Sequence, residues 1–148
     1  MKTKFLCLLM IAFSISAYCQ KKSPNIEGAW KMVQYQTING DKAVIVFPGK
    51  SNADITKIWS GNTCMGVGRI KEDTTVTDMY FLGTYKLTGN KYEENVKYLF
   101  YKPWEGKTIK MTLEMKNDTV IITYPVDDKG QMNKDEAWIE KYVRIKTQ

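Results

Sequence analysis

Histidine does not occur anywhere in this 148-residue chain, and cysteine is scarce, with three copies. The absence of histidine excludes Ser-His-Asp and Cys-His catalysis, and it removes most kinds of zinc site, because imidazole is a common zinc ligand. Beyond the first twenty positions there is no long apolar run, and no useful stretch repeats apolar residues with the helical period. These absences argue against a helical domain and against the commonest hydrolase chemistry.

The amino terminus has the three parts of a secretory signal peptide. Two lysines precede an apolar run at 5–13, and small and polar residues follow as far as Cys19. The apolar run is too short to cross a bilayer. We predict a signal peptide at 1–19 that is cleaved before Gln20, which would place the mature protein in the periplasm or outside the cell.

An alternative use of the same segment is a lipoprotein signal, in which Cys19 would be acylated and become the first residue. The bulky Tyr18 and the polar Ser16 do not suit that signal, but the alternative stays open. We expect membrane contact only in that case. If the cleaved chain starts at Gln20, Cys64 is the only cysteine left, and we interpret it as a small buried strand residue.

The mature chain of 129 residues, 148 less 19, has the length of one domain. We predict a polar lead-in at 20–27 and a domain at 28–148. From residue 28 onward, short runs alternate between apolar and polar residues, which is typical of half-buried antiparallel strands. The predicted strands are 28–38, 41–47, 54–60, 63–71, 77–88, 91–101, 107–116, 119–125 and 137–146.

Four pairs of residues that tolerate positive φ predict tight hairpin turns. They are Asn39-Gly40, Gly61-Asn62, Gly89-Asn90 and Asn117-Asp118. The other connections are longer and alternate with the short ones. This pattern predicts an all-β, antiparallel up-and-down barrel, with the short turns at one end and the long loops around an open mouth.

The number of predicted strands is odd, whereas an antiparallel meander closes on itself only with an even number. Either one run contains two strands, or the run at 41–47 continues its neighbour. We therefore expect about eight to ten strands in the barrel.

Two short motifs carry a resemblance to a known family. Gly28-Ala29-Trp30 opens the first predicted strand, and Glu-Lys-Tyr-Val-Arg at 140–144 lies in the last. The chain resembles the lipocalin-like (calycin) superfamily, and in particular a group of small exported bacterial domains of unassigned function. The resemblance implies a barrel floor closed by Trp30 and Arg144, and a tendency to hold small apolar molecules. The chain departs from the superfamily in having no disulfide, no long C-terminal helix and no helical lid.

If Arg144 meets Trp30 inside the barrel, the alternation assigns one face of each strand to the interior. The predicted interior then has an apolar wall rich in methionine, which suits flexible guests. The predicted inward polar residues are Gln34, Tyr85, Glu94, Tyr98, Glu140 and Tyr142, with Arg69 as a further candidate.

Glu94 breaks the pattern of its strand, because it is a carboxylate on an otherwise apolar and aromatic face. A buried carboxylate is costly unless it is neutral, paired or hydrated. We expect one of these states for Glu94, with Arg144 or Arg69 as the cation if it is paired. Glu94, Tyr142 and Arg144 then form either a structural network at the floor or the site for the polar end of an amphiphile.

We predict non-catalytic binding of a small apolar or amphipathic molecule inside the barrel, with no cofactor and no metal. The alternative is an envelope module with a filled barrel that binds another protein or a glycan. A third hypothesis is an enzyme in which Glu94 and a tyrosine act as an acid–base pair. The predicted ligand-binding residues are Tyr85, Glu94, Tyr142, Arg144, Phe81, Met111, Leu113, Tyr124 and Tyr98.

The net charge of +6 comes almost entirely from dispersed lysines. Nucleic-acid binding favours clustered basic residues with exposed aromatics, so we predict no nucleic-acid partner. Trp104 lies in a loop expected at the open end. We expect it to gate the mouth, to contact an envelope protein or to pack on the rim.

Overall fold

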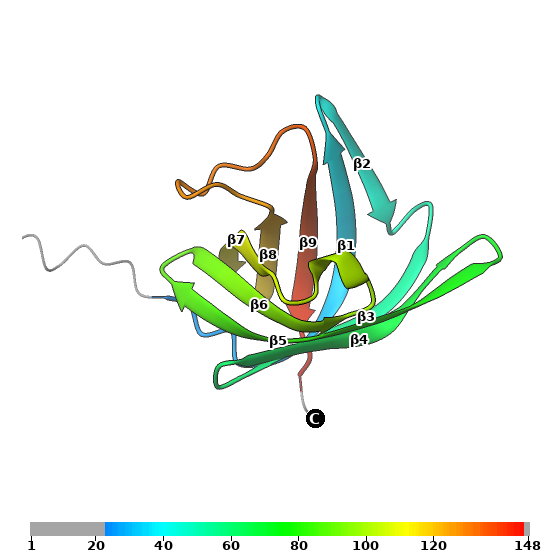
Figure 1. Cartoon of the computed structure of the whole chain (residues 1–148). Helices are drawn as coiled ribbons and strands as arrows, with labels where there is room; N and C mark the ends of the chain where they lie inside the picture. The colour runs from blue at the N-terminus through cyan, green and yellow to red at the C-terminus, as the bar shows by residue number, and fades with distance from the viewer. Residues whose placement is uncertain (1–22, 147–148) are drawn as a thin grey trace, which may run out of the picture.

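Nine antiparallel strands form one sheet that closes on itself in the computed structural model, which describes residues 23–146 (Figure 1). The all-β class and the barrel predicted from the sequence are confirmed. The elements are β1 (Gly28–Asn39), β2 (Lys42–Phe47), β3 (Asn52–Ser60), β4 (Thr63–Glu72), β5 (Thr75–Thr88), β6 (Lys91–Leu99), the short 3₁₀ helix η2 (Lys102–Trp104), β7 (Thr108–Lys116), β8 (Thr119–Tyr124) and β9 (Ala137–Arg144).

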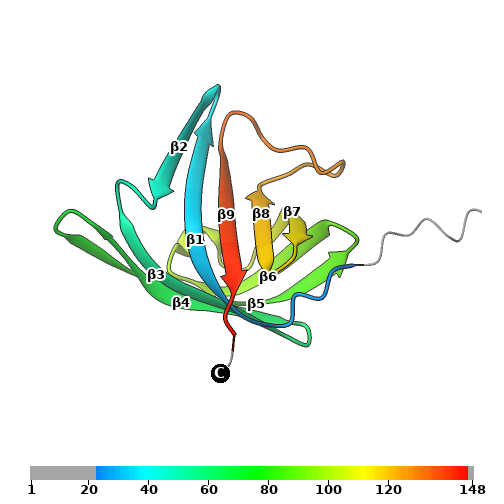
Figure 2. The ribbon, with the colours of Figure 1, turned by 180° about the vertical axis from the view of Figure 1, so that it is seen from behind.

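The two edges of β1 close the barrel. One edge pairs with β9 from Trp30 to Ile38. The other edge pairs with β3 at its start and with β2 at its end, from Tyr35 to Asn39. Because β2 and β3 share this edge, they take one position between them, and the barrel closes with eight strands plus β2 as an extra strand (Figure 2). This is the second of the two routes to closure expected from the sequence.

The placement of the turns corrects one prediction. The turns at 61–62, 89–90 and 117–118 lie at one end, as expected. The first turn is Gly40–Asp41, one residue later than predicted, and it lies at the opposite end with the long loops. The connection from β4 to β5 is also a tight turn rather than a long loop, with Asp73 at a φ of 52°. The first difference arises because β2 is not a barrel position of its own, so the turn before it lies at the other end. The second arises because β4 and β5 stay paired as far as Glu72 and Thr75, which leaves only two residues for the turn.

A bulge in β1 reverses its inward face. The register between β1 and β9 shifts between Met32 and Gln34. Met32 lies inside below the shift, and Tyr35 rather than Gln34 lines the interior above it. The amide of Gln34 instead donates to the side chain of Gln36 at 3.3 Å. The prediction of an inward Gln34 is therefore wrong, because strict alternation cannot reveal a bulge.

A second bulge, in β6, has the same effect. The register between β5 and β6 shifts so that Leu82 pairs with Tyr98 and Gly83 pairs with Val96. Val96 and Leu99 are buried, whereas Tyr98 is 50% exposed on the outside of the barrel. The prediction that Tyr98 lies inward is wrong for this reason, so Tyr98 is not part of the interior that the sequence interpretation assigned to a ligand.

The half of the barrel near the tight turns is filled. Trp30, Trp59 and Tyr92 are fully buried and meet edge to face, with ring centroids 6.0 Å and 6.4 Å apart. Cys64 is also buried, as predicted. Burial, and to a smaller extent the charge of Glu94, raises the pKa of the Cys64 thiol to about 12.

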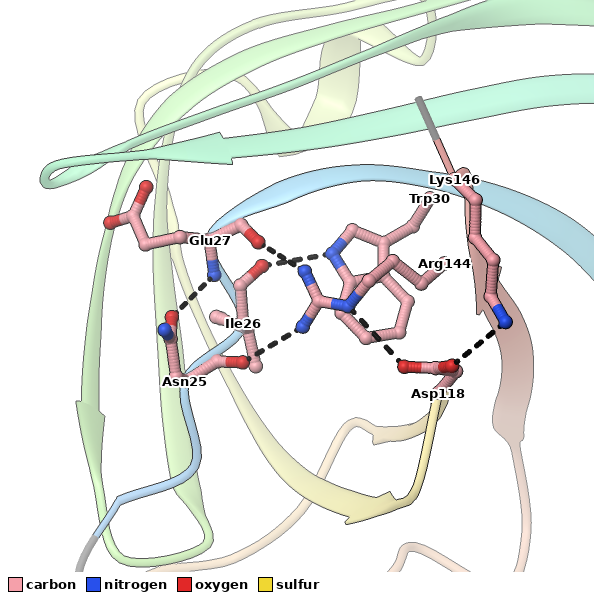
Figure 3. Close-up of polar contacts among 7 residues, drawn as sticks. All are labelled: Asn25, Ile26, Glu27, Trp30, Asp118, Arg144 and Lys146. Carbon is pink, nitrogen blue, oxygen red and sulfur yellow. Dashed lines mark hydrogen bonds and ion pairs between the residues drawn. The ribbon is translucent and has the colours of Figure 1, made fainter. Parts of the chain in front are cut away.

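Residues 23–27 complete the floor of this half (Figure 3). The indole nitrogen of Trp30 donates to the carbonyl oxygen of Ile26 at 2.9 Å, and Ile26 itself is buried. Arg144 lies over the Trp30 ring, 4.1 Å from its centroid, and donates to the carbonyl oxygens of Glu27 at 2.5 Å and Asn25 at 3.1 Å. The contact implied by the resemblance is therefore present, and the lead-in belongs to the floor.

Within the described residues, no helix is long and apolar enough to cross a membrane. The predicted signal peptide and Cys19 lie outside the described residues.

Candidate functional site

The open half of the barrel contains a cavity of about 420 Å³. Its walls come from the inward faces of most of the strands, and its rim includes the loop that carries η2. On β4 the lining residue is Gly66, which has no side chain to fill the space. Most of the lining is apolar or aromatic, with Met32, Ile55, Met79, Phe81, Ile109 and Met111 on the walls.

A buried ion pair lies at the inner end of the cavity. The Lys57 ammonium is 2.5 Å from Oε1 of Glu94, and the two residues are 6% and 3% exposed. The hydroxyl of Tyr92 donates to the same oxygen at 2.5 Å and accepts a hydrogen bond from the indole nitrogen of Trp59 at 2.6 Å. The carboxylate is thus paired with a cation and hydrogen-bonded, as a buried charge must be.

Lys57 is held by aromatic rings as well as by Glu94. Its nitrogen lies 5.3 Å, 5.0 Å and 5.9 Å from the ring centroids of Trp59, Phe81 and Tyr92. These are cation–π distances. Burial alone would lower the pKa of Lys57, but the nearby carboxylates, Glu94 first, outweigh it and raise that pKa. The lysine therefore stays charged and is neutralised from within the protein.

The sequence interpretation missed Lys57 and named the wrong partners for Glu94. Arg69 lies outside the barrel and pairs with Asp78 at 2.7 Å, and Arg144 belongs to the floor. A signal for Lys57 was present, because it alternates in step with the buried residues Ile55 and Trp59 of β3.

A second carboxylate, Glu140 on β9, lines the cavity and has a different environment. Its two oxygens accept hydrogen bonds from the hydroxyls of Tyr124 and Tyr142, each at 2.7 Å. Burial, followed by the charge of Glu140, raises the pKa of both tyrosines well above the ordinary value. Within residues 23–146, no lysine or arginine forms an ion pair with Glu140.

Four aromatic residues form a cluster that we call the mouth aromatics: Tyr101, Trp104, Tyr124 and Trp138. Tyr124 connects this cluster to Glu140. Tyr124 and Trp138 are stacked, with centroids 5.7 Å apart. Trp104 packs edge to face on Trp138 at 5.4 Å and on Tyr124 at 6.1 Å, and Tyr101 packs on Trp104 at 6.0 Å. Of the roles expected for Trp104, packing on the rim matches this arrangement.

The structure brings together only some of the nine predicted ligand-binding residues. Those that line the cavity are Phe81, Glu94, Met111, Tyr124 and Tyr142. Leu113 is buried in the filled half, and Tyr85 lies near the floor, 3.5 Å from Oε1 of Glu27. Both face inward as predicted but lie too deep to reach the cavity. Among the lining residues that this list of nine omitted are Lys57, Tyr35, Glu140 and most of the mouth aromatics.

The described residues contain no group of three or more Asp, Glu, Cys or His side chains placed to hold a metal ion. No protein-family model matches this chain, and a search of curated proteins finds no match either.

Proposed function

We propose that this chain is an exported, lipocalin-like carrier that binds one small apolar or amphipathic molecule in its barrel without transforming it. The observation that carries the proposal is the cavity of about 420 Å³, which lies within the usual size range of small-molecule sites. Membership of the calycin superfamily is part of the proposal. It is supported by the closed eight-strand barrel and by the contact of Arg144 with Trp30.

The division of the interior supports a carrier over a filled scaffold. The tightly packed half supplies a rigid base, and the open half keeps its apolar lining free of packed side chains. A pocket with mainly apolar walls and a few placed polar groups is the usual form of a ligand site.

The proposal assigns Glu94 to the structure rather than to catalysis. Its Oε1 is already shared by the ammonium of Lys57 and the hydroxyl of Tyr92. A general base must be free to take a proton from a substrate. This arrangement therefore gives no support to the acid–base hypothesis.

Native mass spectrometry of protein purified from its own source tests the carrier proposal. We expect a bound mass that is released on denaturation. Met79→Trp, which fills the cavity, should abolish the bound mass, whereas Asp78→Trp adds the same side chain on an exposed position of the same strand and should keep it. Equal occupancy of both variants, with both folded, would contradict binding in the cavity.

Export is tested separately by the intact mass of the mature protein. Cleavage before Gln20 gives a soluble chain, and a lipid-modified Cys19 gives the heavier, membrane-bound alternative. A full-length mass starting at Met1 would contradict both.

A second candidate, contact with another envelope protein, rests on the outer face of the barrel. Met65, Val67, Tyr80 and Tyr98 are 40–60% exposed there, and cross-strand pairing places Val67 directly opposite Tyr80. Exposed apolar patches often mark interaction surfaces. Val67→Lys should remove a cross-linked partner without changing ligand occupancy, if this candidate is right.

A further inference from the structure

The charged side chains that line the cavity do not balance. They are one lysine and three glutamates: Lys57, Glu94, Glu136 and Glu140. Fully ionised, they give the cavity a formal charge of −2, although the whole chain carries +6. Because Lys57 and Glu94 neutralise each other, the excess negative charge belongs to Glu140 on the wall and to Glu136 at the rim.

Glu140 retains capacity to accept hydrogen bonds. An ionised carboxylate has about four acceptor sites, and the two tyrosine hydroxyls account for two of them. The group lines the cavity, so its remaining sites are open to a guest. The guest group that complements them is a donor with positive charge.

The mouth aromatics add to this preference. Aromatic rings carry negative charge on their faces and attract cations, including ammonium groups of ligands. Tyr124 links the cluster to Glu140 through its hydroxyl while it stacks on Trp138. The barrel already holds one ammonium group with a carboxylate and aromatic rings, namely that of Lys57.

We propose that the ligand is an amphipathic organic cation, an amine with an apolar tail, whose ammonium group binds Glu140 beside the mouth aromatics. This inference rests on the proposed carrier function and narrows its ligand class. An anionic head group would meet two glutamates without an available cation, because Lys57 is already paired. The tail would lie along Phe81, Met79 and Met111.

Three ligands with one ten-carbon tail and different head groups test the inference: decylamine, decanol and decanoate. Binding to the purified protein is measured by calorimetry near pH 7.5, where the amine is charged. We expect decylamine to bind about tenfold more tightly than decanol, which corresponds to about 1.4 kcal/mol, a moderate value for a charged contact with aromatic rings. Decanoate should bind more weakly than decanol.

Glu140→Gln keeps the size and a hydrogen-bonding capacity of the side chain while removing its charge. It should lower the affinity for decylamine towards that for decanol and change decanol binding much less, because the amide oxygen still accepts a hydrogen bond from the hydroxyl. Glu114→Gln, an exposed glutamate on β7, removes the same charge outside the barrel and should change neither. Trp138→Leu provides a second test if Glu140→Gln does not fold, and it should weaken decylamine binding more than decanol binding.

The possible outcomes separate the two proposals. Equal affinities for all three ligands, or an equal loss for all three in Glu140→Gln, would overturn the cationic ligand while supporting a carrier. Failure of all three to bind would overturn both. Tighter binding of decanoate than of decylamine would overturn the cationic ligand and indicate an anionic head group instead.

Discussion

Glu94 and Glu140 are carboxylates inside the same barrel, but their surroundings differ. Glu94 lies at the filled half, where Lys57, Tyr92 and the rings around them satisfy its charge. Glu140 lies in the open half, where its oxygens accept hydrogen bonds from two tyrosine hydroxyls and no ion pair with it forms among residues 23–146. The comparison teaches that the partners of a buried charge indicate whether that charge serves the fold or a ligand. A charge neutralised within the protein stabilises or specifies the fold, and a charge left in a cavity favours a guest of opposite sign.

The largest expected effect is on the filled half. Trp30→Ala should lower the free energy of unfolding by about 3–5 kcal/mol, because it removes a fully buried ring from the floor. Trp138→Ala, at the half-buried mouth, should cost distinctly less. Urea unfolding followed by circular dichroism measures both, and equal losses would contradict the division into a structural floor and a functional mouth.

Removing the charge of each glutamate should sharpen the comparison. Glu94→Gln leaves Lys57 buried without a counterion and should cost about 3–5 kcal/mol. Glu140→Gln should cost no more than about 1–2 kcal/mol, because its amide still bonds to the tyrosines.

A double variant controls this prediction. Lys57→Met with Glu94→Gln removes both charges and should recover most of the stability lost in Glu94→Gln alone. If the double variant is less stable than Glu94→Gln, the unpaired lysine is not the cause of the stability lost in Glu94→Gln.

Arg144→Met should lower stability and leave ligand binding unchanged, whereas Glu140→Gln should mainly weaken binding. It removes two charge-assisted hydrogen bonds to floor carbonyls and the contact with Trp30, so we expect a loss of about 2 kcal/mol. Ligand affinity should be unchanged, because Arg144 does not line the cavity. Calorimetry on the folded variant checks this, and a large loss of affinity would extend the site to the floor.

A loss of stability in alkaline solution is expected from the whole set of buried groups that hold protons. The pKa values of Lys57, Tyr92, Tyr124 and Tyr142 are raised in the folded state. The folded chain therefore holds protons that the unfolded chain releases near pH 10, and stability falls as pH rises. Cys64, whose pKa is raised to about 12, adds to this effect, and we expect the free energy of unfolding to fall steadily between pH 8 and pH 10. Urea midpoints across this range measure it, and a midpoint that rises with pH would contradict the sign.

The strands were predictable from the sequence because period-two alternation and turn residues act locally. All nine strands could be placed in this way, including β2, which disturbs the even count. The two bulges were not predictable, since each depends on the partner strand, and they account for the errors at Gln34 and Tyr98.

The candidate site was only partly predictable from the sequence. The sequence does not show how deep in the barrel each side chain lies, or which charged residues form pairs. Alternation tells which side chains point inward, as for Tyr85 and Leu113, but it does not tell how far along the barrel the packing ends. Alternation also does not tell which charged side chains form ion pairs. Lys57 and Glu94 are 37 positions apart, and only the closed sheet brings β3 and β6 to face each other.

Both ends of the described chain lie at the floor, where the amide of Ile145 donates to the carbonyl oxygen of Ala29 and Arg144 bonds to Asn25. Any tether, whether an affinity tag, a bead or a lipid, that is joined ahead of residue 23 or after residue 146 therefore holds the molecule by its base. Immobilised by either end, the protein presents its entrance to the solution. Surface-based binding assays and an anchored form in an envelope would share this orientation.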